Sequence, residues 1–253
     1  MSDRLKLINE YVNNNVFVSF SELCSHFGVS SATMRRDLIE LDKRGLLQRV
    51  HGGAKSIVHL QTEEPSLDIR REMNIEAKRR IAEYCLPMIK DGDSVVLDSS
   101  STVYELARFL SESNLHITVI TNDLYIGCIL APHPIIDLFM VGGVIRKGYY
   151  TSLGMFAENV WKQLHADKLF LGVDAINPSL GLMNYRIEEI TSKRLMLDCC
   201  NEKYVLCDCS KFQTTAVLQI CGFDSIDAII TDKNLSDSIL AQFNSIGTPV
   251  IRA

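Results

Sequence analysis

Several features that would place this chain in other protein classes are missing from its sequence. No stretch approaches the roughly 18 consecutive apolar residues of a membrane-spanning helix. The first residues, Met1 to Lys6, include no apolar run of the kind found in a secretory signal. There is also no internal repeat and no low-complexity segment. We therefore expect a globular, cytoplasmic protein without a membrane partner.

A metal-binding or disulfide pattern is missing too, although the chain has eight cysteines. No C-x-x-C pair occurs. The adjacent Cys199 and Cys200, and the nearby Cys207 and Cys209, have no histidine at ligand spacing. Free thiols in a reducing compartment explain these cysteines better. We expect no metal ion and no cofactor.

An excess of positive charge is lacking, since the net charge is −5. Residues 1–60 nevertheless have eight Lys and Arg against six Asp and Glu, whereas the remainder has 18 against 25. Nucleic-acid binding by the first part would therefore depend on where individual cations lie. With 253 residues and 47% apolar content, the chain is long enough for two domains.

Two short helices joined by a tight turn are predicted between residues 19 and 41. Ser19 and Glu22 have the spacing of a capping box, and Gly28 suits the left-handed residue that ends a helix. A serine at position 30 or 31 would cap the second helix. The buried stripe of that helix is formed at i, i+4 and i+7 by Met34, Leu38 and Leu41.

The same stripe leaves Arg35 and Arg36 on other faces, where a helix offers cations to a DNA major groove. Taken alone, paired arginines are more often a solvated face. Residues 46–50, followed by a glycine turn, are typical of the wing of a winged helix. The candidate DNA-binding residues are Ser31, Thr33, Arg35, Arg36, Lys43, Arg44, Arg49 and His51.

These motifs resemble the DeoR family of bacterial sugar-metabolism repressors. The family module runs S-x-x-T-[IM]-R-R-D-L-x-x-L and then R-x-H-G-G-A. This chain has Ser30 or Ser31, then residues 33–38 and Leu41, and finally residues 49–54 in the same order. The resemblance implies a winged helix-turn-helix DNA-binding domain over residues 1–57, with the helix-turn-helix at about residues 20–39.

The rest of the chain predicts an α/β fold. Residues 58–74 are expected to form a linker, and a helix over about 75–90 opens a second domain that extends to residue 253. Apolar runs then alternate with helices, as in a parallel sheet buried on both faces. Strands are expected at 94–98, 116–121, 135–141, 168–174, 203–208 and 227–231.

Ligands of such sheets bind beyond the carboxyl ends of the strands. Residues 98–102 place hydroxyl and N–H groups at a helix start, which suits an anion, although an ordinary serine cap explains the same pattern. Other strand ends supply Asn122, Arg146, Asp174 and Lys211. Glu189 and Lys193 share one helix face, as in many surface salt bridges. Hydroxyl groups, lysines and acceptors together indicate a phosphosugar site.

This half resembles the DeoR sensor domain, which is similar in fold to ribose-5-phosphate isomerase. The resemblance implies that the loop hydroxyls and Lys211 hold a phosphate, with Asp98, Asp174, Glu189 and Lys193 around the sugar. The family commonly has Gly at the position of Ser100, and Ser enters a positive φ less readily, which would reshape the loop. The candidate effector-binding residues are Asp98, Ser100, Ser101, Thr102, Asn122, Asp174, Glu189, Lys193 and Lys211.

The sequence thus predicts a homo-oligomeric repressor of a carbohydrate-utilisation operon, which binds operator DNA and is released by a phosphorylated sugar. The alternative is a sugar-phosphate isomerase with a DNA-binding appendage and Glu189 as its base, but the glycine-rich lysine motif of those enzymes is missing. A ligand-free architectural DNA protein is disfavoured, because residues 75–253 would then have no role. We expect no catalytic residues.

Overall fold

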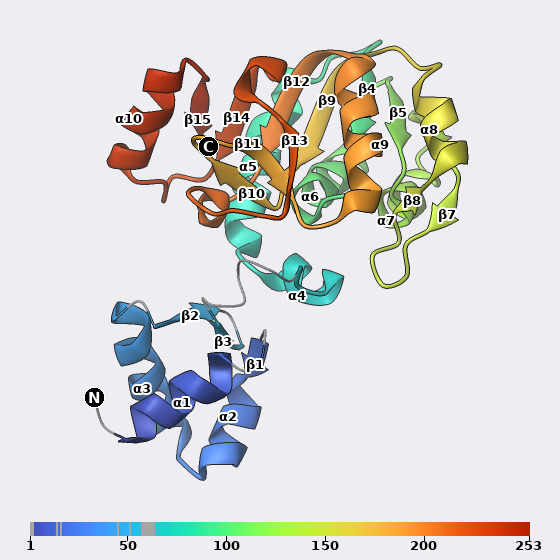
Figure 1. Cartoon of the computed structure of the whole chain (residues 1–253). Helices are drawn as coiled ribbons and strands as arrows, with labels where there is room; N and C mark the ends of the chain where they lie inside the picture. The colour runs from blue at the N-terminus through green and yellow to red at the C-terminus, as the bar shows by residue number, and fades with distance from the viewer. Residues whose placement is uncertain (1–2, 14, 16, 45, 51, 57–63) are drawn as a thin grey trace. The chain divides into compact units, whose positions relative to one another are not determined.

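The computed structural model describes residues 3–13, 15, 17–44, 46–50, 52–56 and 64–253. It divides the chain into two units, Met1–Asn74 and Ile75–Ala253 (Figure 1). No helix among these residues is long and apolar enough to cross a membrane. His51 of the predicted wing and residues 57–63 lie outside the described residues.

The smaller unit has a three-helix and three-strand arrangement followed by one further helix. Its elements are α1 (Asp3–Asn13), β1 (Phe17–Ser19), α2 (Phe20–Phe27), α3 (Ser31–Lys43), β2 (Leu47–Val50), β3 (Gly53–Ser56) and α4 (Leu67–Glu72). Strand β3 lies between β1 and β2 and is antiparallel to both, so the first strand pairs with the wing. Helix α4 lies within the segment predicted as a linker.

The helix boundaries of this unit follow from its capping residues. The Ser19 hydroxyl accepts a hydrogen bond from the N–H of Glu22, and Gly28 ends α2 with a left-handed φ of 62°. Ser30 caps α3 by accepting from the N–H of Thr33. The predicted stripe of α3 is buried among apolar residues of α1, α2 and the wing, and the unit's core consists of Leu5, Ile8, Val12, Val18, Leu23, Met34, Leu38, Leu41, Leu47 and Ala54.

A seven-stranded sheet forms the centre of the larger unit. Its strands, in spatial order, are β15 (Val250–Arg252), β14 (Ala228–Thr231), β12 (Cys200–Leu206), β9 (Ala166–Gly172), β4 (Ser94–Leu97), β5 (Thr118–Thr121) and β6 (Asp137–Met140). Every neighbouring pair is parallel. This sheet confirms the predicted α/β class.

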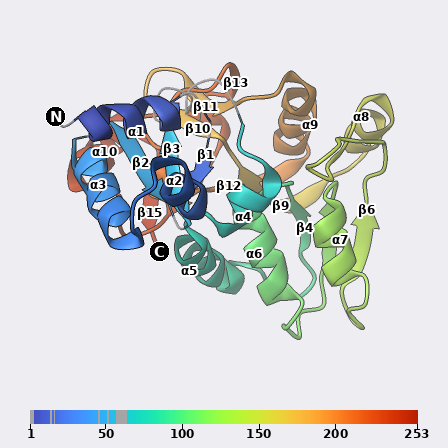
Figure 2. The ribbon, with the colours of Figure 1, turned by 90° about the horizontal axis from the view of Figure 1, so that it is seen from below.

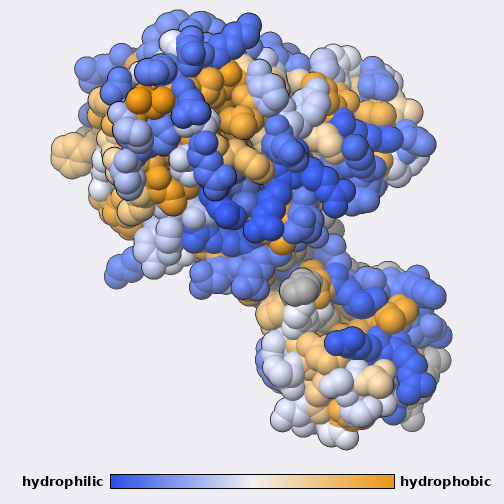
Figure 3. Space-filling model, turned by 180° about the vertical axis from the view of Figure 1, so that it is seen from behind, coloured by the Kyte–Doolittle hydropathy of each residue, from blue (hydrophilic) through white to orange (hydrophobic). Residues whose placement is uncertain are grey.

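Helices cover both faces of this sheet, as Figure 2 shows for α5 to α7 on one side and α8 and α9 on the other. The helices are α5 (Ile75–Cys85), α6 (Ser101–Leu110), α7 (Leu124–Leu130), α8 (Met155–Trp161), α9 (Ile187–Asp198) and α10 (Asp237–Ile246). Side chains alternate along each strand, so Val95 and Val96 of β4 enter two different hydrophobic cores. The face seen in Figure 3 is mostly hydrophilic, with smaller hydrophobic areas on each unit.

Several elements of the larger unit were not predicted from the sequence. They are the hairpin of β7 (Val144–Ile145) and β8 (Ser152–Leu153), the small antiparallel sheet of β10 (Ala175–Asn177), β11 (Gly181–Asn184) and β13 (Leu218–Cys221), and the C-terminal α10 and β15. The helix expected over 75–90 was wrong at its end. Helix α5 stops at Cys85, and a 3₁₀ turn follows because Pro87 cannot donate a helical hydrogen bond.

The order of the strands reverses between β4 and β9. From β4 the chain adds β5 and β6 on one side, and it then crosses to add β9, β12, β14 and β15 on the other. The connections after β4 and β9 therefore leave in opposite directions, which opens a crevice at the carboxyl edge of a parallel sheet. Gly172 ends β9 at this point, and a Cβ added there would collide with the side chain of Ser100.

We predict that Gly172→Ala destabilises the larger unit by about 1–3 kcal/mol, because the added methyl group overpacks the space beside Ser100. Urea unfolding followed by tryptophan fluorescence measures this, since the single tryptophan, Trp161, is fully buried in the larger unit. Gly142→Ala is the matched control, because a Cβ at Gly142 meets no atom within 4 Å. Equal effects of the two substitutions would contradict the prediction.

Candidate functional site

The exposed face of α3 has a cluster of cations. Arg35, Arg36 and Lys43 are exposed there, and Arg44 and Arg49 extend the positive surface past the end of the helix. Ser31 is exposed as well, whereas Thr33 is half-buried and its hydroxyl lies 3.0 Å from that of Ser30. The candidate DNA-binding residues that the structure describes are therefore close together, around α3 and the wing.

Local contacts hold some of these cations in place. The Arg35 guanidinium lies 5.5 Å from the centre of the Phe20 ring at the start of α2. The Nε atom of Arg36 donates to the carbonyl of Ala32 at 3.5 Å. Arg44 forms an ion pair with Glu40, one turn earlier on the helix. Arg35 and Arg36 therefore have no acidic partner among the residues for which the structure gives contacts.

The acid of the Arg-Arg-Asp run does not oppose these charges on the exposed face. Asp37 is buried, and its two oxygens accept from Nε and Nη2 of Arg4 at 2.7 and 3.1 Å. This hydrogen bonding, with the charge of Asp37, raises the pKa of Arg4. The paired contact ties α3 to α1, so Asp37 has a structural role beneath the cationic face.

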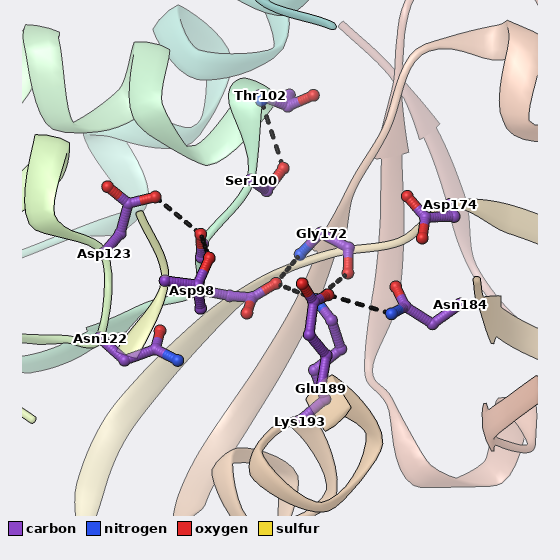
Figure 4. A network of polar contacts seen from close by, with 12 residues as sticks. Asp98, Ser100, Thr102, Asn122, Asp123, Gly172, Asp174, Asn184, Glu189 and Lys193 are labelled. Atoms are coloured by element: carbon purple, nitrogen blue, oxygen red, sulfur yellow. Dashed lines mark hydrogen bonds and ion pairs between the residues drawn. The ribbon is translucent and has the colours of Figure 1, made fainter. Parts of the chain in front are cut away.

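A buried polar cluster lies where the strand order reverses (Figure 4). We use the term polar cluster for Asp98, Asn122, Gly172, Asp174, Asn184, Glu189 and Lys193. At its centre, Oδ2 of Asp98 accepts from Nζ of Lys193 at 2.6 Å and from the N–H of Gly172 at 2.9 Å. Lys193 also donates to the carbonyl of Gly172 at 3.0 Å. Burial would lower the pKa of Lys193, but Asp98 and Glu189 outweigh it and raise that pKa.

Glu189 lies one turn before Lys193 on α9 and has partners from two other elements. Its Oε1 accepts from Nη1 of Arg146 at 2.5 Å, and its Oε2 accepts from the side chain of Asn184 on β11 at 3.0 Å. Arg146 is in the β7–β8 hairpin, and its guanidinium lies 3.7 Å from the ring centre of Tyr149. The carboxylate of Glu189 is thus engaged on both oxygens.

The hairpin is also tied to the ends of β4 and β5. The Ser99 hydroxyl lies 2.7 Å from Oδ2 of Asp123 and 2.5 Å from the Thr151 hydroxyl. The side-chain nitrogen of Asn122 donates to the carbonyl of Ser152, whereas its Oδ1 is buried and has no partner among the described residues. An unpaired buried acceptor is costly, so Oδ1 of Asn122 is a candidate contact for a ligand hydroxyl.

The loop from Ser100 to Thr102 begins α6. The Ser100 hydroxyl accepts from the N–H of Thr102 at 3.2 Å, and all three residues of the loop are buried. Ser100 has an extended backbone with φ of −150°, so the left-handed conformation that serine disfavours is not required here. The position that requires glycine is Gly172, because a Cβ there would collide with the Ser100 side chain.

Lys211 lies in a second charged group at the end of β12. Lys211 is half-buried, one 3₁₀ turn after the buried Asp208. Although burial opposes ionisation of Asp208, Lys211, the Ser210 hydrogen bond and Lys78 outweigh it and lower the pKa of Asp208. Lys78 is a buried lysine of α5. The structure gives no contact of Lys211 with the Ser100–Thr102 loop among the described residues.

The structure brings Lys193 into contact with Asp98 and places Glu189 one helical turn away from it. Arg146, which the sequence placed among the strand-end residues, pairs with Glu189. Sequence reasoning did not select two residues that the structure adds, Lys78 and Asn184. Lys78 had a detectable signal, since it occupies the same helix face as the apolar Ile81, Ala82 and Cys85. No group of acidic, His or Cys side chains suited to a metal ion occurs among the described residues.

Comparisons with known proteins identify the same family for both units. Residues 4–59 match the family model of the DeoR-like helix-turn-helix domain, and residues 73–233 match that of the DeoR C-terminal sensor domain. The chain is 30% identical to the HTH-type transcriptional regulator GolR of Listeria innocua, covering 98% of this chain and 97% of that protein. It is 32% identical to a lactose phosphotransferase system repressor of Staphylococcus epidermidis, covering 92% of each.

Among solved structures, the chain is similar to ribose 5-phosphate isomerase A of Methanocaldococcus jannaschii. The identity is 20%, the TM-score is 0.41, and the match covers 55% of each chain. The similarity therefore covers about half of each chain.

We predict that Lys193→Met lowers the stability of the larger unit by about 3–5 kcal/mol, because Asp98 is left buried without its cation. Since the pKa of Lys193 is raised above its ordinary 10.5, this contribution is complete at neutral pH and lost as the pH rises beyond about 10.5. Urea unfolding at pH 7 and in alkaline buffer, followed by Trp161 fluorescence, measures both effects.

The matched control is Lys162→Met, since Lys162 is exposed at the end of α8. Adding Asp98→Asn to Lys193→Met should restore part of the lost stability, because the unpaired charge is removed. A stability difference that stays constant through the alkaline range would show that the ion pair is not its source.

Proposed function

Since this chain belongs to the DeoR family of transcriptional regulators, we propose that it represses a carbohydrate-utilisation operon and that a phosphorylated sugar relieves the repression. The smaller unit binds operator DNA in the cytoplasm through α3 and the wing. The larger unit binds the sugar phosphate at the polar cluster. Regulation of sugar uptake or breakdown is suggested by relatives such as the lactose phosphotransferase system repressor.

The observation that carries the effector assignment is the position of the polar cluster. It lies at the carboxyl edge of a parallel sheet, at the point where the strand order reverses, which is where such folds bind ligands. Its buried side chains offer a mixture of carboxylate, amide and ammonium groups, which suits a polyhydroxylated molecule. Asn122 Oδ1 adds an acceptor that has no partner among the described residues.

A phosphate group fits the neighbouring positions. The N–H groups at the start of α6, a ten-residue helix, attract an anion, and the Ser101 and Thr102 hydroxyls lie beside them. Lys211 and the buried Lys78 supply cations at the end of β12, two strands away. We assign the phosphate to this region and the sugar hydroxyls to Asp98, Asp174 and Glu189.

The isomerase alternative is not favoured. The relatives are named as regulators and repressors, and the ion pair of Glu189 with Arg146 opposes its use as a base. Accepting a proton would break that pair and leave the Arg146 guanidinium without its carboxylate. A partnered carboxylate is suited to binding a hydroxyl group rather than to moving a proton.

Operator binding by this chain needs more than one copy. A single reading helix contacts only a few base pairs, and related modules reach a useful specificity by placing two copies on half-sites one helical turn apart. We therefore propose a homo-oligomer. A thermal-shift screen of phosphorylated sugars identifies the effector, because a ligand stabilises the folded state by RT ln(1 + [L]/Kd). No stabilisation by any phosphorylated sugar, with none by the free sugars, would reject the sensor assignment.

We predict that Arg35→Ala and Arg36→Ala each weaken operator binding by about 1–3 kcal/mol, because each removes an exposed cation without creating a cavity. Mobility-shift titrations at fixed salt concentration measure the change. Arg80→Ala is the control, since Arg80 is an exposed arginine of α5 in the larger unit. Unchanged operator affinity in both α3 variants would reject this mode of DNA binding.

We predict that Lys211→Ala binds the operator normally but needs about tenfold more effector for release, because a charge-assisted hydrogen bond to the phosphate is lost. Titrating the operator complex with the effector found in the screen measures this. Lys162→Ala serves as the lysine control, since Lys162 is exposed at the end of α8. Release at the parental effector concentration would place the phosphate elsewhere.

A further inference from the structure

One large side chain on the exposed face of α3 is apolar. Ile39 is 37% exposed, and it is the only large hydrophobic side chain of α3 that the structure records as exposed among the described residues. It belongs neither to the core of the smaller unit nor to the partly buried residues packed against that core. Ile39 is therefore available to a partner of the helix.

The position of Ile39 on the helix is more informative than its exposure. An α-helix advances by about 100° per residue, so residues seven apart lie on nearly the same line. Ala32 and Ile39 have this spacing, and Ala32 is also exposed. Arg35 and Arg36 flank that line on its two sides by about 40–60° each. The buried residues Met34, Leu38 and Leu41 lie on the opposite face.

An apolar line with one arginine on each side suits the cross-section of a DNA major groove. The groove has phosphates along both walls, and the base edges at its floor include one apolar group, the 5-methyl of thymine. Single exposed apolar side chains are ordinary on protein surfaces. Leu7 of α1, at 54% exposure, is such a residue, but Ile39 lies between the two arginines that are expected to contact DNA.

We propose that Ile39 is a specificity-determining residue that packs against a thymine methyl group in each operator half-site, with Ala32 beside it. The inference rests on the proposed binding of operator DNA by α3. Arg35 and Arg36 then supply affinity from both sides of the groove, and Ile39 selects an A·T base pair in a defined orientation. The pairing needs no hydrogen bond, so it discriminates by apolar contact area alone.

The test uses the full chain and a change to the DNA that deletes only the methyl group. The preferred site is first selected from a pool of random duplexes with the parent protein. Each thymine of that site is then replaced singly by uracil. We expect about a fourfold loss of affinity at one position in each half-site, the equivalent of one buried methyl group. At that position Ile39→Ala should bind thymine and uracil equally.

Two further variants sharpen the result. Ile39→Val keeps branched apolar contacts and should retain part of the preference for thymine. Leu7→Ala removes a more exposed apolar side chain, on α1, and should leave every uracil penalty unchanged. Because Ile39 is exposed and alanine favours helices, Ile39→Ala is expected to fold.

The outcomes separate this inference from the proposed function. Sequence-specific binding by the parent protein, with identical uracil penalties in the parent and Ile39→Ala, would overturn the role of Ile39 and leave DNA binding by α3 intact. The same conclusion would follow if no uracil substitution changed the affinity. Failure of the parent protein to select any site would overturn both.

Discussion

A buried charge must have a buried partner, and in the larger unit this constraint organises the carboxyl edge of the sheet. Lys193 of α9 lies against Asp98 after β4 and against the backbone of Gly172 at the end of β9. These three elements meet where the strand order reverses. The ion pair therefore fixes the crevice itself, and the surrounding groups take their positions relative to a contact that is expensive to break.

In the smaller unit a partly buried ion pair lies beneath an exposed cationic face. Asp37, the acid of the Arg-Arg-Asp run, is buried and bonded to Arg4. Arg35 and Arg36 therefore stay exposed on α3 without being paired to it. The net charge of the whole chain is −5, and bulk attraction to DNA is weak. The separation of Asp37 from Arg35 and Arg36 across one helix compensates for this, because it gives a local positive face on an acidic protein.

Local patterns in the sequence predicted much of this architecture. Ser19, Gly28 and Ser30 set helix ends through contacts with neighbouring residues, and these contacts can be read from spacing. Most strands of the parallel sheet could also be predicted, because each is an apolar run that is continuous in the sequence. The partners of Glu189 could not, because Arg146 and Asn184 approach from a hairpin and a small sheet whose strands are only two to four residues long. Lys78 meets Asp208 across 130 residues of sequence, a proximity that only the fold creates.

The pairing of Arg146 with Glu189 has a consequence for the lifetime of a signal. A regulator that chemically converted its own inducer would remove the inducer that it binds. The transcriptional response would then depend on the rate of this conversion and not only on the inducer concentration. In this chain the carboxylate considered as a base, that of Glu189, already accepts hydrogen bonds on both oxygens. Together with the missing glycine-rich lysine motif, the ion pair of Arg146 with Glu189 therefore favours a site that would bind the proposed ligand without converting it.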